Sequence, residues 1–160
     1  MNFETDIVSV FDKKWALLTA GDKDSFNTMT VSWGGMGTIW SKPVVTSYIR
    51  TSRYTHEFVD REDYFTISFF PEEYKKTLGV LGSQSGRDMD KMKESGLTPK
   101  AVGESVTFEE AEVTLLCKKL FMQRLDKENI MESEPDVKAF YDGDDEHDMY
   151  IGEVVEIIKQ

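Results

Sequence analysis

The sequence predicts a mainly β protein, an antiparallel all-β barrel of about six strands with short helical insertions. Over most of the chain, apolar residues occur in short runs or in strict alternation, as in strands. Helical spacing is confined to a few short segments, and these do not alternate regularly with strands as a doubly wound fold requires. We treat residues 1–160 as a single domain, because 39% hydrophobic content suffices for one core and no linker or repeat is visible.

Four strands are predicted in the first half of the chain. They cover residues 15–20, 27–33, 43–50 and 64–70. In the second, Met29, Val31 and Trp33 alternate with hydroxyl residues, and the glycine-rich residues 34–37 are expected to break the pattern. Pro43 opens the third strand, where a missing N–H is tolerated.

Helices are expected over residues 55–62, 72–82 and 85–95. The second has apolar residues at helical spacing and ends at Gly82. In the third, Ser85 is expected to be the N-cap, Asp88 to complete a variant of the capping box, and Gly96 to end the helix.

The last part of the chain predicts two further strands. Residues 110–125 form a long strand or a bent pair, with Cys117 in the apolar register as a small core residue. The acidic residues 142–148 predict a solvated loop, and residues 149–159 predict the closing strand.

Charge and cysteine content limit the partners and the location. Thirty acidic residues against 19 basic ones give a net charge of -11, which argues against nucleic acid and anionic membranes as partners. A single cysteine excludes an intrachain disulfide and suits a reducing compartment. The N-terminus has no signal-peptide pattern and no segment has the length of a membrane span, so we expect a cytoplasmic protein.

A cluster of phosphate-binding residue types stands between the third strand and the helix after it. Arg50 and Arg53 supply guanidinium groups that can each hold two phosphate oxygens, and Ser52, Tyr54 and Thr55 supply hydroxyls. Because they lead into a helix N-terminus, they are arranged as in a site for a small anion. An ordinary helix cap with solvated arginines explains the same residues equally well.

Two other segments have the composition of ligand-binding backbone. Residues 27–34 form a strand whose small hydroxyl side chains leave its backbone open to the edge of a planar ring, although an ordinary barrel strand has the same pattern. In residues 82–91, Gly86 permits close approach of the backbone, Ser83 and Ser85 add donors, and Lys91 lies on the following helix. A capped connection between helices is the alternative.

His147 is the one candidate for proton chemistry. A histidine there can donate a proton or position a ligand near neutral pH, but its acidic surroundings favour a solvated loop residue. Two histidines and one cysteine make a zinc site unfavourable, and no Gly-x-x-x-x-Gly-Lys or Gly-x-Ser-x-Gly motif is present. Hydrolase and metalloenzyme functions therefore have little support.

Taken in order, these segments resemble the flavin reductase-like family, the FMN-binding split barrels that include flavoredoxin-type proteins. The matching segments are residues 15–21, 27–35, Trp40, Pro43, 50–55, 82–88, 90–91, 96–97 and 147–154. Each is weak alone, but the ordered set spans nearly the whole chain.

The resemblance implies a six-stranded antiparallel split barrel of Greek-key type, forming a homodimer with FMN near the subunit interface. It implies that the phosphate is held by residues Arg50, Ser52, Arg53 and Thr55 of the cluster that includes Tyr54. It implies that the isoalloxazine is lined by Thr28, Met29, Thr30, Val31 and Ser32. Ser83, Ser85 and Gly86 are expected at the ribityl and phosphate end, and His147 is the candidate catalytic residue.

Three functions stay open at this point. The first is an NAD(P)H-dependent flavin oxidoreductase, in which hydride passes from the nicotinamide to FMN. The second is an FMN electron carrier that receives electrons from a redox partner protein. It is motivated by Asp145-Glu146 before His147, where family members that use a nicotinamide carry Gly-Asp. The third is a flavin-free split-barrel protein.

Overall fold

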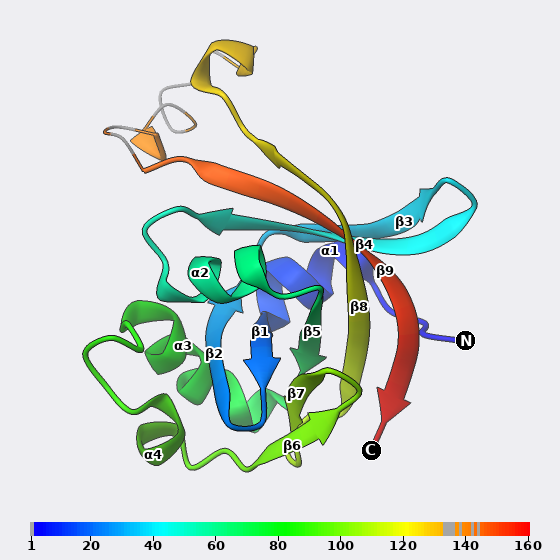
Figure 1. Ribbon diagram of the computed structural model, residues 1–160, viewed down its shortest axis with the longest axis vertical. Coiled ribbons are helices and arrows are strands. Elements are labelled where there is room, and N and C mark those ends of the chain that lie inside the picture. Colours follow the sequence, from blue (N-terminus) through cyan, green and yellow to red (C-terminus); the bar gives the residue numbers. More distant parts are fainter. Residues whose placement is uncertain (1, 133–136, 138, 142, 144) are drawn as a thin grey trace.

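Seven antiparallel strands form the main sheet, in the order β2-β1-β5-β8-β9-β4-β3. The structure, a computed structural model, describes residues 2–132, 137, 139–141, 143 and 145–160. The strands of the main sheet are β1 (Ala16–Asp22), β2 (Ser25–Val31), β3 (Gly34–Ile39), β4 (Lys42–Arg50), β5 (Tyr64–Phe69), β8 (Val113–Arg124) and β9 (His147–Lys159). A separate hairpin pairs β6 (Pro99–Val102) with β7 (Ser105–Phe108). Figure 1 shows the far ends of β8 and β9 projecting from the rest of the chain.

The helices are short and lie before β1 or between strands. They are α1 (Ile7–Ser9), a π-helical turn (Val10–Lys14), α2 (Tyr54–Arg61), a 3₁₀ turn (Glu72–Tyr74), α3 (Lys75–Ser83), α4 (Lys91–Ser95) and a 3₁₀ turn (Lys127–Asn129). None of the helices in these described residues is long and apolar enough for a bilayer crossing.

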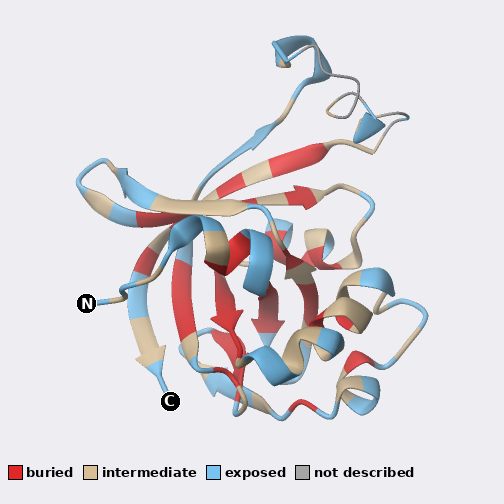
Figure 2. Cartoon of the chain, turned by 180° about the vertical axis from the view of Figure 1, so that it is seen from behind, coloured by how far each residue is buried: buried red, intermediate tan, exposed pale blue. Residues whose placement is uncertain are grey.

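β1 shows why the core lies where it does. Its apolar run is continuous because β2 and β5 flank it and both of its faces are covered. Leu18 packs into the main core cluster, whereas Leu17 packs into a second cluster with Leu78 and Phe108. Figure 2 shows the buried residues concentrated in these central strands. Cys117 is buried in the main cluster, as predicted.

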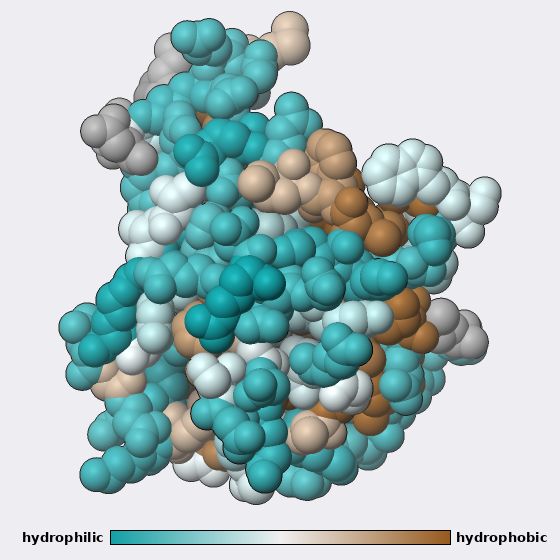
Figure 3. Space-filling model, in the orientation of Figure 1, coloured by the Kyte–Doolittle hydropathy of each residue, from teal (hydrophilic) through white to brown (hydrophobic). Residues whose placement is uncertain are grey.

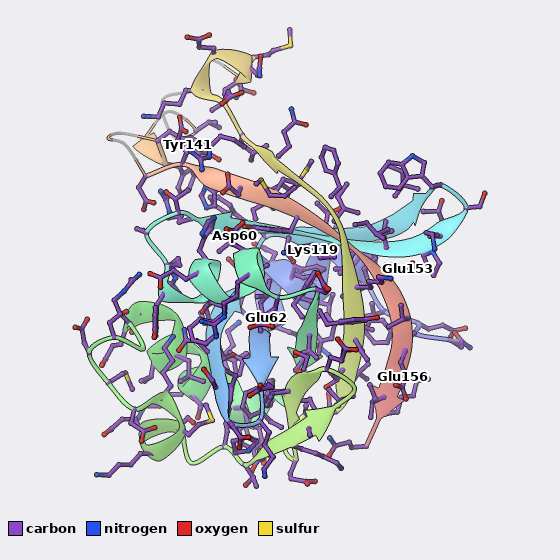
Figure 4. All side chains as sticks on the ribbon, in the orientation of Figure 1. Asp60, Glu62, Lys119, Tyr141, Glu153 and Glu156 are labelled. Carbon is purple, nitrogen blue, oxygen red and sulfur yellow. The ribbon has the colours of Figure 1, made fainter. Side chains whose placement is uncertain are left out.

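α2 is fixed to the sheet at its C-terminal end. Lys119 of β8 donates from Nζ to the carbonyl oxygens of Val59 and Asp60 at 2.8 and 2.6 Å. Figure 4 shows the Lys119 side chain beside the end of α2 where Asp60 lies. A lysine at the last carbonyls also suits the helix dipole. This anchor holds the C-terminal end of α2 against β8.

The expected antiparallel arrangement is confirmed, but six strands was too few. Residues 34–37 do not interrupt strand structure as expected. They begin β3, whose backbone pairs with β4 from Gly34↔Ser47 to Ile39↔Lys42. A Cβ at Gly34 would come within 2.8 Å of the Phe11 ring. Glycine is therefore required at this position by close packing and not by a turn. The β6–β7 hairpin was also missed.

The predicted helix over 85–95 is wrong in its first half. α4 begins at Lys91, because the side chain of Asp90 accepts from the N–H groups of Met92 and Lys93 at 3.1 Å each. Ser85 instead accepts from the N–H of Arg87 at 3.2 Å within a turn. The helices expected over 55–62 and 72–82 correspond to α2 and to the 3₁₀ turn with α3.

Of the two alternatives predicted for residues 110–125, the long strand is confirmed: β8 is one strand with two register shifts. The start of β9 differs from the prediction. β9 begins at His147, so His147 and Asp148 belong to a strand and not to a solvated loop; Asp148 is only 1% exposed. Asp142 and Asp144 of the expected loop lie outside the described residues.

Candidate functional site

Two neighbouring cavities meet at Arg53. The larger, about 240 Å³, lies between β2, β4 and the start of β9. The smaller, about 140 Å³, lies between the first turn of α2 and the segment that follows α3. Arg53 lines both cavities, so a ligand that occupies the two passes its guanidinium group.

The sequence-predicted residues divide between these cavities. The larger is lined by Met29, Thr30, Val31, Ser32, Arg50, Arg53 and His147. The smaller is lined by Ser52, Arg53, Tyr54, Thr55, Ser83, Ser85 and Gly86. Thr28 lines neither; its buried hydroxyl accepts from Thr19 Oγ1 at 2.9 Å and donates to the carbonyl of Leu18 at 3.2 Å.

Arg53 is positioned by the junction of β4 and α2. It occupies the N-cap position with extended backbone (φ -71°, ψ 133°), and its side chain makes no capping bond. Its Nη1 donates instead to the carbonyl oxygen of Gly82 at 2.7 Å, which ties α2 to the end of α3. Burial lowers the pKa of Arg53 and the charge of Arg50 adds to this, while Asp145 opposes both.

Lys91, which the sequence analysis placed in the segment 82–91 without assigning it as a site residue, is a further binding-site candidate. It is only 6% exposed, and its Nζ donates to the carbonyl oxygens of Thr28 and Leu81 at 2.6 and 2.9 Å. Burial, followed by the charge of Arg53, lowers the pKa of Lys91 to about 8. Neither Lys91 nor Arg53 forms an ion pair with a carboxylate in the described part of the chain. The sequence shows Lys91 after the capping Asp90, but nothing in it signals that the ammonium is buried.

Close backbone packing shapes the smaller cavity. A Cβ at Gly86 would lie 2.2 Å from Asn27 Oδ1 and 3.2 Å from the Tyr54 ring. Asn27 in turn donates from Nδ2 to the Thr55 hydroxyl at 2.8 Å. Only glycine therefore fits between β2 and the first turn of α2, which explains the predicted close approach at this position.

The three predicted serine hydroxyls at the smaller cavity already have partners within the protein. Ser52 Oγ donates to Asp145 Oδ2 at 2.7 Å, and Ser83 Oγ donates to the carbonyl of Val80 at 3.1 Å. Ser85 Oγ accepts from a backbone N–H, as described above. Each retains a lone pair or a rotatable proton for a further bond.

Arg50 lines the larger cavity but not the smaller one. Its Nη1 donates to the carbonyl of Asp145 at 3.0 Å, and its Nη2 donates to the carbonyl of Phe140 at 2.9 Å. The two arginines that the sequence groups together therefore face different parts of the site. Arg50 places positive charge beside the larger cavity, and Arg53 places it where the cavities join.

His147 is buried, not solvated as its local sequence favoured. It is 5% exposed, and its Nδ1 has no hydrogen-bond partner within the described residues. The rings of Trp33 and Tyr141 lie 5.2 and 5.6 Å from it, centroid to centroid. Burial, with the charge of Arg50 second, lowers the pKa of His147 to about 4, so the imidazole is neutral at pH 7. A neutral imidazole with a free nitrogen can exchange a hydrogen bond with a ligand in the cavity.

Aromatic side chains complete the larger cavity. Trp33, Tyr48 and Phe140 line it, and the Trp33 and Phe140 rings meet edge to face with centroids 4.9 Å apart. None of the three was predicted as a site residue. Nothing in the sequence distinguishes Tyr48 and Phe140 from strand and loop residues outside the site.

A comparison with protein families gives one match. The model described as "Flavin reductase like domain" matches residues 9–159 of this chain. A comparison with curated proteins gives no match.

Solved structures with the same fold include two flavoredoxins. Flavoredoxin of Desulfovibrio vulgaris (Miyazaki F) is 21% identical, with a TM-score of 0.69 over 91% of this chain and 69% of that one. Flavoredoxin from Methanosarcina acetivorans is 17% identical, with a TM-score of 0.70 over 100% of this chain and 75% of that one. An FMN-binding protein from Thermus thermophilus, with bound 1-cyclohex-2-enone, is 20% identical, with a TM-score of 0.67 over 99% and 79%.

Proposed function

This chain belongs to the flavin reductase-like family, and we propose that it is a flavoprotein that binds FMN across the two joined cavities. The observation that carries the proposal is a pair of cations at the smaller cavity, the half-buried Arg53 and the buried Lys91, neither of which has a carboxylate partner in the described chain. Unpaired buried charges are costly, and a bound phosphate is the natural counter-ion for them. Flavoredoxins and an FMN-binding protein are among the structures with this fold.

The residues of both cavities fit the parts of FMN. The smaller cavity offers the two cations, serine and threonine hydroxyls and the close backbone approach at Gly86 to a phosphate. The larger offers apolar and aromatic side chains, the open strand backbone of residues 29–32 and the free Nδ1 of His147 to a planar polar ring. We propose that the sheet forms the split barrel typical of the family around this site.

The chain's own groups have definable tasks. Bound FMN supplies the transfer of hydride or electrons, which no side chain here can perform. The neutral His147 would hold a hydrogen bond to the flavin ring through its unpartnered Nδ1, and at pH 7 it has no imidazolium proton to give. Arg50, fixed by two carbonyl oxygens, supplies positive charge beside the larger cavity, which favours negative charge on a ligand there. Trp33 and Phe140 supply apolar ring surface on that side.

We propose NAD(P)H:flavin oxidoreductase activity as the first function and electron transfer from a redox partner protein as the second. One observation favours the second. Asp145, which stands in the region where family members that use a nicotinamide carry Gly-Asp, binds the β4–α2 turn through Ser52 N–H and Oγ at 3.1 and 2.7 Å. It adds a carboxylate at the edge of the site, and a carboxylate there repels an anionic nucleotide.

Anaerobic reduction separates the two functions. The purified protein is loaded with FMN, and flavin absorbance is followed after addition of NADH or NADPH, with dithionite as the control reductant. Rapid bleaching with either nucleotide supports the oxidoreductase. Bleaching with dithionite but with neither nucleotide supports the electron carrier. The Asp145→Gly variant then tests whether the Asp145 carboxylate excludes the nucleotide. A protein that retains no FMN after gel filtration, and does not bind it in a titration, contradicts both.

We also propose a homodimer. Trp40, at the tip of the β3–β4 hairpin, is 62% exposed, and Phe121 on β8 is 37% exposed. Figure 3 shows hydrophobic surface beside the projecting part of β8, next to the β3–β4 hairpin. Large apolar side chains on an exposed sheet face are typical of an interface. Sedimentation equilibrium checks this: a dimer is expected, with Trp40→Ser weakening it, and a monomer at all concentrations contradicts it.

A further inference from the structure

Asp148 is a buried carboxylate that the proposed function leaves unused. It is only 1% exposed and directly follows His147 in β9. Because successive side chains of a strand point to opposite faces of the sheet, the two residues face different surroundings. His147 pairs with Arg50 of β4, and both line the larger cavity. Asp148 pairs with Ile49, which packs in the main core, and its carboxylate contacts α2.

Side chains from two other elements hold this carboxylate. Arg124, at the end of β8, donates from Nε to Oδ1 at 2.5 Å and from Nη2 to Oδ2 at 3.2 Å. His56, in the first turn of α2, has its Nε2 2.7 Å from Oδ2. Burial alone would raise the pKa of Asp148, but the hydrogen bonds from Arg124 and His56 outweigh it and lower that pKa. The carboxylate is therefore ionised at pH 7 and only accepts, so Nε2 of His56 carries a proton and donates it.

Through these bonds Asp148 joins the elements that carry the two cavities assigned to FMN. His56 directly follows residues 53–55, which line the smaller cavity. Asp148 directly follows His147, whose carbonyl oxygen also accepts from the N–H of Leu125 at 2.9 Å. The carboxylate thus links the first turn of α2 to the start of β9 and to the end of β8.

These bonds fix geometry more than they add stability. A buried ion pair is weak evidence for stability, because desolvation offsets much of its attraction. The forked guanidinium of Arg124, by contrast, meets a carboxylate in a defined orientation. α2 has other sources of stability, since Phe58 and Val59 pack in the main core and Lys119 binds its last carbonyls. The bond from His56 therefore serves mainly to place the first turn of α2 relative to β9.

We propose that Asp148 is a positioning residue of the flavin site, which holds the phosphate-binding turn of α2 in place relative to His147. Asp148 itself lines neither of the two cavities, so it acts through His56 and Arg124. The inference rests on the proposed function, because that function assigns the turn to the FMN phosphate and His147 to the flavin ring.

Two substitutions of His56 test the bond to α2. His56→Phe keeps a ring and removes the N–H. Losing one hydrogen bond corresponds to a roughly 2- to 10-fold change in affinity. FMN affinity is therefore expected to fall by about that factor, with riboflavin affinity unchanged, because only FMN places a phosphate at the turn. His56→Gln, which keeps a side-chain N–H, is expected to restore FMN binding.

The matched control is Glu62→Gln, which removes an exposed ion pair with Arg61 at the end of α2. It is expected to change neither affinity. Fluorescence titration gives the affinities, at a temperature at which urea unfolding shows that every variant is folded.

Arg124→Met tests the bond to β8. It is expected to lower FMN and riboflavin affinity by the same factor, because His147 faces the ring that both ligands share. Asp148→Ala removes both bonds, so adding His56→Phe to it is expected to change FMN affinity no further. If Asp148→Ala does not fold, the His56 and Arg124 variants decide the question without it.

Failure of this inference is distinguishable from failure of the proposed function. Wild-type protein that binds FMN, with His56→Phe and Arg124→Met binding equally well, overturns the inference alone. Equal losses of FMN and riboflavin affinity in His56→Phe also overturn it, as does a His56→Gln variant that binds FMN no better than His56→Phe. Wild-type protein that binds no flavin overturns the inference together with the proposed function.

Discussion

Arg53 and Lys91 donate to neighbouring main-chain carbonyls at the end of α3. Arg53 Nη1 donates to the oxygen of Gly82 at 2.7 Å, and Lys91 Nζ donates to that of Leu81 at 2.9 Å. The negative end of the helix dipole thus holds two like charges beside one another. Each cation keeps at least one further N–H group with which it can bind an anion. The carbonyl oxygens hold the two cations in place, so no carboxylate partner is needed for that.

Replacing Lys91 removes one of these two cations. Lys91→Met is expected to weaken FMN binding by about 10- to 100-fold, because a charge-assisted hydrogen bond is worth about 1.5–3 kcal/mol. Riboflavin, which has no phosphate, is expected to bind unchanged. Fluorescence titration measures both ligands, and Lys93→Met, exposed on the same helix, is the control. An equal loss for FMN and riboflavin contradicts the phosphate assignment.

The pKa of Lys91 predicts a pH dependence of FMN binding. With a pKa of about 8 in the free protein, Lys91 is charged at pH 7 and increasingly neutral above pH 8. The FMN phosphate is already fully ionised above pH 7, since its second pKa is about 6. FMN affinity is therefore expected to fall between pH 7 and pH 9.5, while riboflavin affinity stays constant. Lys91→Arg should flatten the FMN curve, and a flat curve in the wild type contradicts the prediction.

Arg50 and Arg53 are expected to differ, because only Arg53 lines the smaller cavity. Arg53→Ala should lower FMN affinity about 10- to 100-fold and riboflavin affinity much less. Arg50→Ala should lower both affinities by a similar factor, because Arg50 faces only the larger cavity. The FMN-to-riboflavin affinity ratio is the readout, and an equal change of that ratio in both variants would rule out the separation of roles.

His147 predicts a loss of stability in acid. Its pKa is about 4 in the folded protein and about 6.5 in an unfolded chain. Between these values the unfolded state binds more protons, so the free energy of unfolding falls as the pH falls from 6.5 to 4. The loss is at most about 3 kcal/mol. Urea unfolding of the apoprotein at several pH values measures it, and His147→Gln should show a weaker pH dependence over this range. Identical slopes for the two proteins would contradict burial of the imidazole.

Gly86→Ala tests the close approach of backbone at the smaller cavity. The new Cβ would lie 2.2 Å from Asn27 Oδ1, so Asn27 must move and its bond to Thr55 is lost. A loss of about 1–3 kcal/mol in unfolding free energy is expected, together with weaker FMN binding. Gly35→Ala, where nothing lies within 4 Å of the new Cβ, is the control. Thermal unfolding measures the stability of both variants. Equal stability of Gly86→Ala and Gly35→Ala would contradict the close packing at Gly86.

Much of this protein could be predicted from the sequence, because the signals are local. Period-two alternation identified β2, an apolar run identified β1, and hydroxyl and guanidinium groups at the end of β4 marked a candidate anion site. The ordered motifs predicted the family, which the match over residues 9–159 confirms. These features depend on the side-chain period of a strand and on residue type, which a linear sequence displays directly.

Only the tertiary structure decided which of those residues face one another. Pairing of β4 with β9 places Arg50 opposite His147, and packing of α4 beneath β2 buries the Lys91 ammonium. The fold also places Arg50 at the larger cavity only and Arg53 at both cavities, and it pairs the glycine-rich β3 with β4. Burial and charge neighbours arise from contacts between residues far apart in the chain. The sequence therefore determined the kinds of groups available, and the fold decided their ionisation, their partners and the cavity that each one lines.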